Sequence, residues 1–142
     1  MARTRRDPPL IRAKGRRKPC GAEEARARLA KARQFLTLAT AGQEDETVRS
    51  AEASLLIEAG IAAADAICCV RLGERPADQN HQAAVDLLAS VHRDAARRLQ
   101  TLLGLKTSVQ YGTGDPSAAR LRAARRAASA LMDVARQAVS ET

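Results

Sequence analysis

The stretch Ala53–Leu72, ASLLIEAGIAAADAICCVRL, limits the possible folds more than any other part of the chain. Its length would allow a membrane span, but Glu58 and Asp65 lie inside it, and each acid costs about 2.5–3.5 kcal/mol at the centre of a bilayer. The many alanines cannot offset two such acids. The stretch is therefore predicted to be the central, largely buried helix of a bundle, with no membrane partner.

The composition also favours helices. Hydrophobic residues make up 45% of the chain, but the aromatic residues are limited to Phe35 and Tyr111, and there is no tryptophan. The core must therefore be built from Ala, Leu, Ile and Val, of which Ala and Leu are strong helix formers. The lack of aromatic platforms argues against binding nucleic acid by base stacking. The 142 residues are enough for one domain with its own core.

Apolar residues recur at steps of three and four in five segments, as they do on the buried face of a helix. The first segment is Ala22–Ala41, and the second runs from a cap at Thr47 to Leu72, where Gly73 ends it. The remaining three are Gln79–Val91 after a cap at Asp78, Asp94–Tyr111, and Pro116–Val139. The pattern predicts an all-α bundle of four to five helices over residues 22–142.

The net charge of +8 is concentrated at the N-terminus. Residues 1–20 carry eight basic groups and one acid, whereas the rest of the chain is nearly neutral. Met1–Gly21 also contains three prolines and two glycines, and it has too few apolar residues to bury. We predict that it is a disordered basic arm. Such an arm can serve as a solubilising leader, or it can bind the phosphates of nucleic acid.

The remaining chain is divided into an acidic part and a basic part. Residues 41–90 hold three basic and nine acidic groups, and residues 93–126 hold eight basic and two acidic groups. The two parts could attract each other within one fold or across a homodimer. The predicted surface for RNA, a nucleotide or a partner protein comprises Arg93, Arg97, Arg98, Lys106, Tyr111, Arg120, Arg122, Arg125 and Arg126.

The three cysteines, Cys20, Cys68 and Cys69, show no spacing typical of a metal site. Cys68 and Cys69 are adjacent in the apolar segment, which favours buried, reduced thiols. Reduced thiols suit a cytoplasmic protein. We expect no metal and no cofactor.

Arg75 and His81 are separated by five residues in the stretch GERPADQNHQ. An imidazole with a near-neutral pKa can exchange a proton with an RNA 2′-hydroxyl or a leaving oxygen, and a guanidinium can stabilise charge on a phosphate. The alternative is a loop arginine beside a histidine at the start of a helix. Glu58 and Asp65, seven residues apart on one helix face, either pair with arginines of a neighbouring helix or orient a catalytic group.

Several phrases of the chain resemble a known family. They are KARQFLTLA, LLIEAGIAAADAICCVRLGERPADQNHQAAVDLL, RRLQTLLGLKTSVQYG and the alanine-rich final helix. In this order they resemble a HEPN domain, and more closely the small actinobacterial-type HEPN proteins. The resemblance covers about 120 residues, from Ala22 to the C-terminus.

The resemblance implies a homodimer of four- or five-helix subunits. Active HEPN domains are metal-independent ribonucleases, often toxins paired with a nucleotidyltransferase antitoxin, and their signature is an Arg followed after four to six residues by a His. The corresponding segment here, LKTSVQYG, offers Lys106 and Tyr111 instead. Lysine is a poorer phosphate clamp than arginine, and tyrosine is a poor base at pH 7.

We therefore expect a non-catalytic or weakly active HEPN module that dimerises and binds RNA, a nucleotide or a partner protein. The first alternative is a metal-independent ribonuclease that uses Arg75 and His81, supported by Glu58 or Asp65. The second alternative is a DNA-associated structural protein that acts through the arm 1–21.

Overall fold

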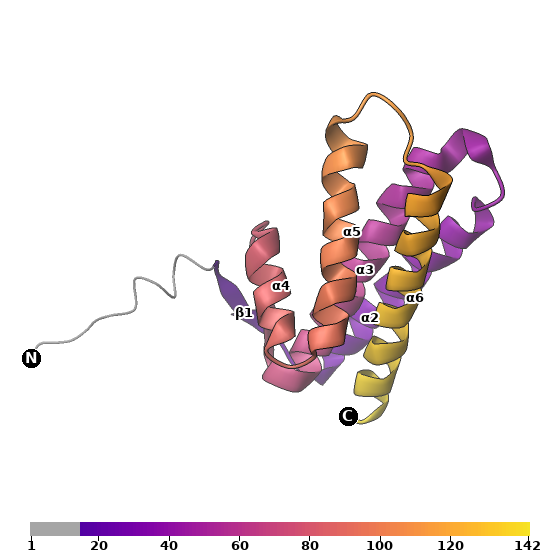
Figure 1. Cartoon of the computed structure of the whole chain (residues 1–142). Helices are drawn as coiled ribbons and strands as arrows, with labels where there is room; N and C mark the ends of the chain where they lie inside the picture. The colour runs from indigo at the N-terminus through magenta and orange to yellow at the C-terminus, as the bar shows by residue number, and fades with distance from the viewer. Residues whose placement is uncertain (1–14) are drawn as a thin grey trace, which may run out of the picture.

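The computed structural model describes residues 15–142, and residues 1–14 lie outside the described part. The described residues form a bundle of five α-helices with one two-stranded sheet beside it (Figure 1). The elements are β1 (Arg17–Pro19), α2 (Ala22–Ala41), the 3₁₀ turn η1 (Glu46–Val48), α3 (Arg49–Leu72), β2 (Glu74–Pro76), α4 (His81–Ala89), α5 (Arg93–Tyr111) and α6 (Ala118–Ser140). The prediction of an all-α helical bundle is confirmed.

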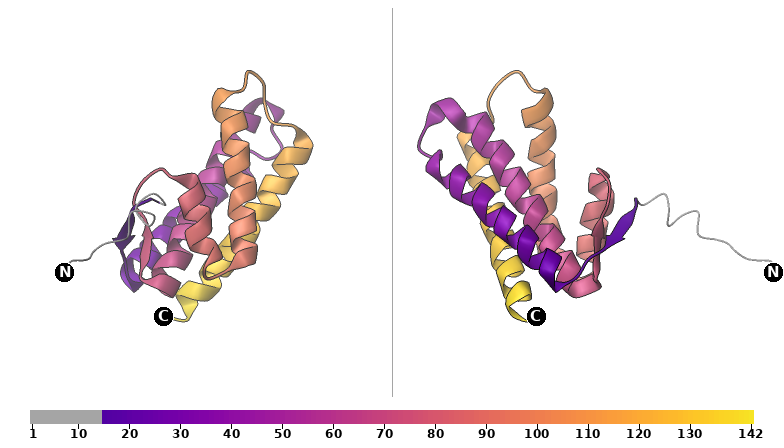
Figure 2. Two further views of the ribbon diagram at one scale, coloured as in Figure 1. Left: turned by 60° about the vertical axis from the view of Figure 1, so that its left-hand side comes forward. Right: turned by 180° about the vertical axis from the view of Figure 1, so that it is seen from behind.

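Helix α3 lies at the centre of the bundle and packs against α2, α5 and α6. Figure 2 shows α2 crossing its back face and α5 and α6 on the other side. The apolar part of this helix, together with η1, is long enough to cross a membrane, but 72% of its most apolar window is buried inside the bundle. A central bundle helix meets the same criteria of length and composition, and that is the environment in which α3 is found.

Close packing around α3 depends on small side chains. At Gly60 a Cβ atom would lie 2.3 Å from Cδ1 of Leu102 on α5 and 3.4 Å from Cδ1 of Leu131 on α6. Alanine is the most frequent residue at the other buried positions of α3. The alanine-rich composition therefore lets α5 and α6 approach the central helix closely.

Two predicted helix starts are wrong by a few residues. The side chain of Asp45, not Thr47, caps the turn η1 by accepting from the backbone N–H of Thr47, and α3 follows at Arg49. At the next start the cap is Asn80 rather than Asp78, because the Asn80 side chain accepts from Ala83 N at 2.9 Å. In both cases a polar side chain near the predicted cap offers the better geometry.

His92 is also part of a helix start and not a simple linker residue. Its Nδ1 accepts a hydrogen bond of 3.0 Å from the backbone N–H of Ala95, so it caps α5. The predicted end of α3 is confirmed, because Gly73 has φ +72°, a left-handed conformation that suits glycine.

The segment before α2 is ordered, contrary to the prediction of a disordered arm up to Gly21. Strand β1 pairs antiparallel with β2, with Lys18 opposite Arg75. The correction applies to residues 15–21, and the remainder of the predicted arm lies outside the described residues. The sequence signal was weak because a three-residue strand has almost no periodicity to detect.

A disulfide joins Cys20 to Cys69, with the Cα atoms 5.2 Å apart. The prediction of reduced thiols is therefore wrong for Cys69 and correct for Cys68, which is free and buried. The cytoplasmic location inferred from reduced thiols stays a prediction. The disulfide could not be predicted from local sequence, because the two cysteines lie 49 residues apart.

Candidate functional site

A cavity of about 290 Å³ lies where α2, α3, α4 and α5 meet the loop after β2. All four predicted catalytic residues line it, although they come from separate parts of the chain. The charged side chains and the histidine of its lining are Arg28, Glu58, Asp65, Arg75, Asp78, His81 and Lys106, and the free thiol of Cys68 lines it too. The structure thus brings together the four candidate catalytic residues and one member of the predicted basic surface.

Arg75 reaches the cavity from β2, but its charge already has a partner. Its Nε forms an ion pair with the carboxylate of Glu24 on α2, and its Nη1 donates to the carbonyl oxygen of Pro76 at 3.2 Å. The hydrogen bond from Arg75 lowers the pKa of Glu24 below its usual value. A guanidinium paired in this way has less free charge to offer a phosphate.

Asp65 is buried at 8% exposure and accepts a hydrogen bond of 2.8 Å from Nη2 of Arg28 on α2. Burial raises the pKa of Asp65, and the nearby guanidiniums of Arg28 and Arg75 oppose that rise. The simpler of the two predicted roles, pairing with an arginine of a neighbouring helix, is the one that the contacts of Asp65 display.

One nitrogen of the Arg28 guanidinium takes no part in this pair. Within residues 15–142, Nε of Arg28 is a buried side-chain nitrogen with no hydrogen-bond partner. Buried polar groups are nearly always paired with protein, water or ligand. Since Arg28 also lines the cavity, an acceptor held there would complete its hydrogen bonds.

His81 is the first residue of α4 and lies on the cavity wall. Burial lowers the pKa of His81 from its ordinary value of 6.5, and the positive charge of Lys106 lowers it further, while Glu58 acts in the opposite direction. The imidazole is therefore neutral at pH 7, with one nitrogen able to accept a proton and the other able to donate a hydrogen bond.

A second, shallower hollow of about 370 Å³ continues from the first between α3 and α5. It shares Glu58 and Lys106 with the cavity, and its other lining residues are Ser54, Ile57, Val109 and Gln110. The two hollows together form a groove with polar groups along its length. Glu58, which is exposed, lies at the point where they meet.

Most of the predicted basic surface does not converge on this cavity. Arg93, Arg97 and Arg98 lie at the start of α5, whereas Arg120 and the other α6 arginines lie at the opposite end of the bundle, because the two helices run in opposite directions (Figure 1). Arg97 and Arg98 both pair with Asp94, and Arg120 donates to Oγ of Ser108 at 3.0 Å. The set is therefore two separate groups plus Lys106.

Arg125 belongs to the core of the structure more than to a binding surface. It forms two hydrogen bonds to the buried carboxylate of Glu52 on α3, at 2.5 and 2.9 Å, and a third to the carbonyl oxygen of Gln43. Glu52 is only 3% exposed and was missed by the sequence reading. The available signal was a carboxylate immediately before the apolar segment, which needs a partner if the position is buried.

The other residues of interest lie outside the cavity or were missed. Tyr111 is 78% exposed at the end of α5 and does not line either hollow. Arg28 and Glu24 were not predicted, although the requirement of Asp65 for a cationic partner on a neighbouring helix pointed toward such a residue.

One group within residues 15–142 has the donors of a metal site: Cys20, Glu24 and Cys69 place a ligand atom each within 4.8 Å of one another. The two sulfurs are joined in a disulfide, so they are not thiolate ligands in this structure. The remaining thiol, Cys68, is inert, since burial raises its pKa to about 12.

The chain matches no protein-family model and no curated protein sequence. The resemblance to HEPN domains therefore rests on the sequence phrases given above.

Proposed function

We propose that this protein is a non-catalytic HEPN-like module that binds a nucleotide, or one nucleotide of an RNA strand, in the cavity around His81. The observation that carries the proposal is the convergence of Arg28, Arg75, His81 and Lys106 from four elements on one cavity. These residues lie far apart in the sequence. Ion pairs with Asp65 and Glu24 hold Arg28 and Arg75 at the cavity, and His81 and Lys106 join them from α4 and α5.

The size and charge of the cavity favour a ligand with both donors and acceptors. Its volume is near the lower limit of the about 300–1,000 Å³ typical of small-molecule sites. Three cationic side chains and three carboxylates line the cavity, so it is not a binding site for a simple anion. A nucleotide fits this balance, because Lys106 can bind its phosphate while Glu58 or Asp78 accepts from the amino groups of its base.

The second hollow supports the extension from a nucleotide to RNA. A strand whose first nucleotide occupies the cavity could continue between α3 and α5, past Glu58 and Lys106 toward Gln110. The absence of aromatic platforms would then leave recognition to hydrogen bonds and charge.

Binding is favoured over cleavage by the state of Arg75. A transition-state phosphate needs an uncompensated cation close to its developing charge. The guanidinium of Arg75 is instead neutralised by Glu24. The pair Lys106 and Tyr111, which replaces the family signature, does not converge either, because Tyr111 lines neither hollow.

A metal-independent ribonuclease remains the second candidate, since Arg75 and His81 do share one cavity and His81 is neutral at pH 7. Such an imidazole could take the proton from an RNA 2′-hydroxyl. This candidate requires a substrate phosphate to displace Glu24 from Arg75.

Calorimetric titration with the four 5′-ribonucleoside monophosphates tests the binding proposal. We expect saturable binding by the wild type, and affinity at least about tenfold weaker in Lys106→Ala, because a charge-assisted contact to phosphate is lost. Arg122→Ala is the matched control, because it removes a charge that lines neither hollow of this groove. Equal affinities in all three proteins would contradict the proposal.

A cleavage assay separates the two candidates. Labelled structured RNA is incubated with the protein in EDTA, beside His81→Ala. We expect intact RNA at high protein concentration. Products with 2′,3′-cyclic phosphate ends that disappear in His81→Ala would instead establish the ribonuclease.

We further propose a homodimer, which the family resemblance implies. One apolar surface supports it: on α2, Leu38, which is 60% exposed, lies beside Ala30 and Ala41 in a shallow hollow. Light scattering of the full chain at micromolar concentration should give twice the 15.2 kDa mass, and a monomer mass across that range would exclude the dimer.

A further inference from the structure

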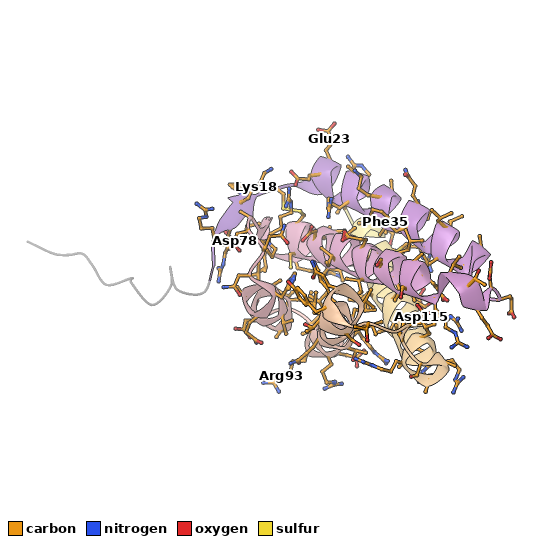
Figure 3. The ribbon with its side chains drawn as sticks, turned by 90° about the horizontal axis from the view of Figure 1, so that it is seen from above. Lys18, Glu23, Phe35, Asp78, Arg93 and Asp115 are labelled. Atoms are coloured by element: carbon orange, nitrogen blue, oxygen red, sulfur yellow. A yellow bond between two sulfur atoms is a disulfide. The ribbon has the colours of Figure 1, made fainter. Side chains whose placement is uncertain are left out.

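The N-terminal strap, defined as residues 15–24, pairs with the segment 73–78, which is called the wall segment below. Residues 75–78 of the wall segment line the cavity, whereas the strap lies behind them. Figure 3 labels Lys18 on the strap and Asp78 on the wall segment at the same end of the bundle, and Lys18 pairs with Arg75 in the sheet. The strap therefore contacts the site and is not a separate appendage.

The strap and the wall segment are joined by a row of hydrogen bonds and ion pairs. Ala77 N donates to Arg16 O at 2.9 Å, and Arg16 N donates to Oδ2 of Asp78 at 3.1 Å. Cys20 N donates to Gly73 O at 3.0 Å. Two ion pairs, Arg17 with Glu74 and Arg75 with Glu24, complete the row.

These hydrogen bonds and ion pairs hold the strap only weakly on their own. The residues of β1 are exposed and those of β2 are half-buried. A two-stranded sheet of this length is at best marginally stable in water. The exposed ion pair of Arg17 with Glu74 contributes little, and only the pair of Arg75 with Glu24 is half-buried. Something else must keep the strap in place.

The disulfide is the covalent link between the strap and the bundle. Cys69 lies in the last turn of α3 at 3% exposure, so it is fixed by the core, while Cys20 is half-buried on the strap. The bond joins the strap to α3 directly beneath the wall segment, whose first residue, Gly73, ends that helix.

We propose that the Cys20–Cys69 disulfide is a reducible latch that holds the N-terminal strap on the wall of the cavity, and that its reduction releases the strap and opens the site. The proposal names a form of regulation for the site of the proposed function and rests on it to that extent. Its consequence for the cavity is specific: when the strap leaves, Glu24 can separate from Arg75, and the guanidinium becomes available to a ligand.

The reaction is ordinary thiol–disulfide exchange with a dithiol reductant. A reductant thiolate attacks Sγ of Cys20, the more accessible sulfur, the S–S bond breaks, and Cys69 leaves as a thiolate that takes up a proton. The second thiol of the reductant then attacks the mixed disulfide and releases Cys20. The protein gains two thiols and the dithiol becomes a disulfide.

Cys68 does not compete in this exchange. It is adjacent to Cys69 but buried at 1% exposure, and its thiol stays protonated because burial raises its pKa to about 12. The thiolate is the reactive form of cysteine. The latch therefore opens and closes between one defined pair.

Amide hydrogen exchange of the full chain, with and without dithiothreitol, tests the latch. We expect exchange in peptides covering 15–24 and 73–78 to become at least about tenfold faster on reduction, because the strap is no longer tethered to α3 and the open state is more populated. Peptides from the α5–α6 contact should be unchanged. Alkylation and mass measurement establish that the bond has been reduced.

Two variants complete the test. The double variant C20S/C69S should show the fast exchange without reductant, and Cys68→Ser, which keeps the disulfide, should match the oxidised wild type and still respond to dithiothreitol. Unchanged exchange in the reduced protein would overturn the latch. Loss of helical circular dichroism on reduction would also overturn it, because the bond would then stabilise the whole fold and not the strap alone.

The readout is independent of any nucleotide. If the strap is released but no nucleotide binds in either state, the latch stands and the proposed function fails. If nucleotides bind equally well to oxidised and C20S/C69S protein with identical exchange, the proposed function stands and the latch fails.

Discussion

His81 lies between two opposite charges, Lys106 and Glu58, and this arrangement gives a paired prediction. Lys106 lowers the pKa of the imidazole and Glu58 raises it. Lys106→Gln should therefore raise the pKa of His81, and Glu58→Gln should lower it further. NMR titration of the imidazole protons measures both, with His92, the cap of α5, as an internal reference in the same spectra.

Shifts of the same sign in the two variants, or no shift in either, would show that the three side chains do not share a cavity. Equal movement of His92 would point to a change in the whole fold instead of a local charge effect.

The lowered pKa of His81 also predicts a dependence of stability on pH. Because the folded pKa lies below the ordinary value of 6.5, the unfolded chain binds the proton more readily. Stability is therefore lost as the pH falls from 6.5 through the folded pKa. Urea unfolding at pH 7 and pH 5 should show a smaller loss for His81→Gln than for the wild type, and equal losses would contradict the shift.

Arg125 gives the largest expected effect of a single side chain. Arg125→Ala would leave the carboxylate of Glu52, 3% exposed, without its partner. Breaking a buried pair typically costs about 3–5 kcal/mol of folding free energy. Because Arg125 is partly exposed, we expect a loss of about 3 kcal/mol. Urea unfolding measures it, with the exposed Arg122→Ala as control, for which we expect less than about 0.5 kcal/mol.

A loss for Arg125→Ala as small as that of the control would show that Glu52 is solvated or protonated, and not held by this pair.

At the scale of the elements, two glycines in neighbouring helices should respond in opposite ways to alanine. In α3, Gly60→Ala would place a Cβ 2.3 Å from Leu102, a fully buried side chain, and overpacking of this kind costs about 1–3 kcal/mol. In α5, a Cβ at Gly104 meets nothing within 4 Å, so Gly104→Ala should stabilise by about 0.5–1 kcal/mol. Thermal unfolding of both variants checks the contrast.

Destabilisation by both substitutions would show that α5 needs a flexible point at Gly104. Stabilisation by both would show that α3 and α5 are farther apart than the packing at Gly60 requires.

The elements also show what could be predicted from the sequence. Apolar spacing located all five helices, because each buries one face and the spacing of buried residues is fixed by the helix geometry. The starts of α3 and α4 were displaced because Asp45 accepts from the backbone N–H of Thr47, and because Asn80, not Asp78, accepts from that of Ala83. Such choices depend on loop geometry that residue types do not specify.

At the scale of the whole molecule, contacts between distant segments were the main feature that could not be predicted from the sequence. The charge count showed an acidic part 41–90 and a basic part 93–126, and the pair Glu52–Arg125 joins them within one chain. The disulfide Cys20–Cys69 and the pairing of β1 with β2 were not predicted, since neither leaves a local pattern. The candidate residues around Arg75 and His81 were found, but Arg28 and the pairing of Arg75 with Glu24 required the structure.

The central claim is that the cavity around His81 binds a nucleotide, and the two histidines of the chain allow it to be tested in one spectrum. Purified oxidised protein and, in parallel, the C20S/C69S variant are titrated with each 5′-ribonucleoside monophosphate while the imidazole signals of His81 and His92 are followed by NMR. The account predicts that at least one nucleotide shifts His81 saturably, with half-saturation below about 1 mM, and leaves His92 in place. No movement of His81 at millimolar concentrations of all four nucleotides would contradict it.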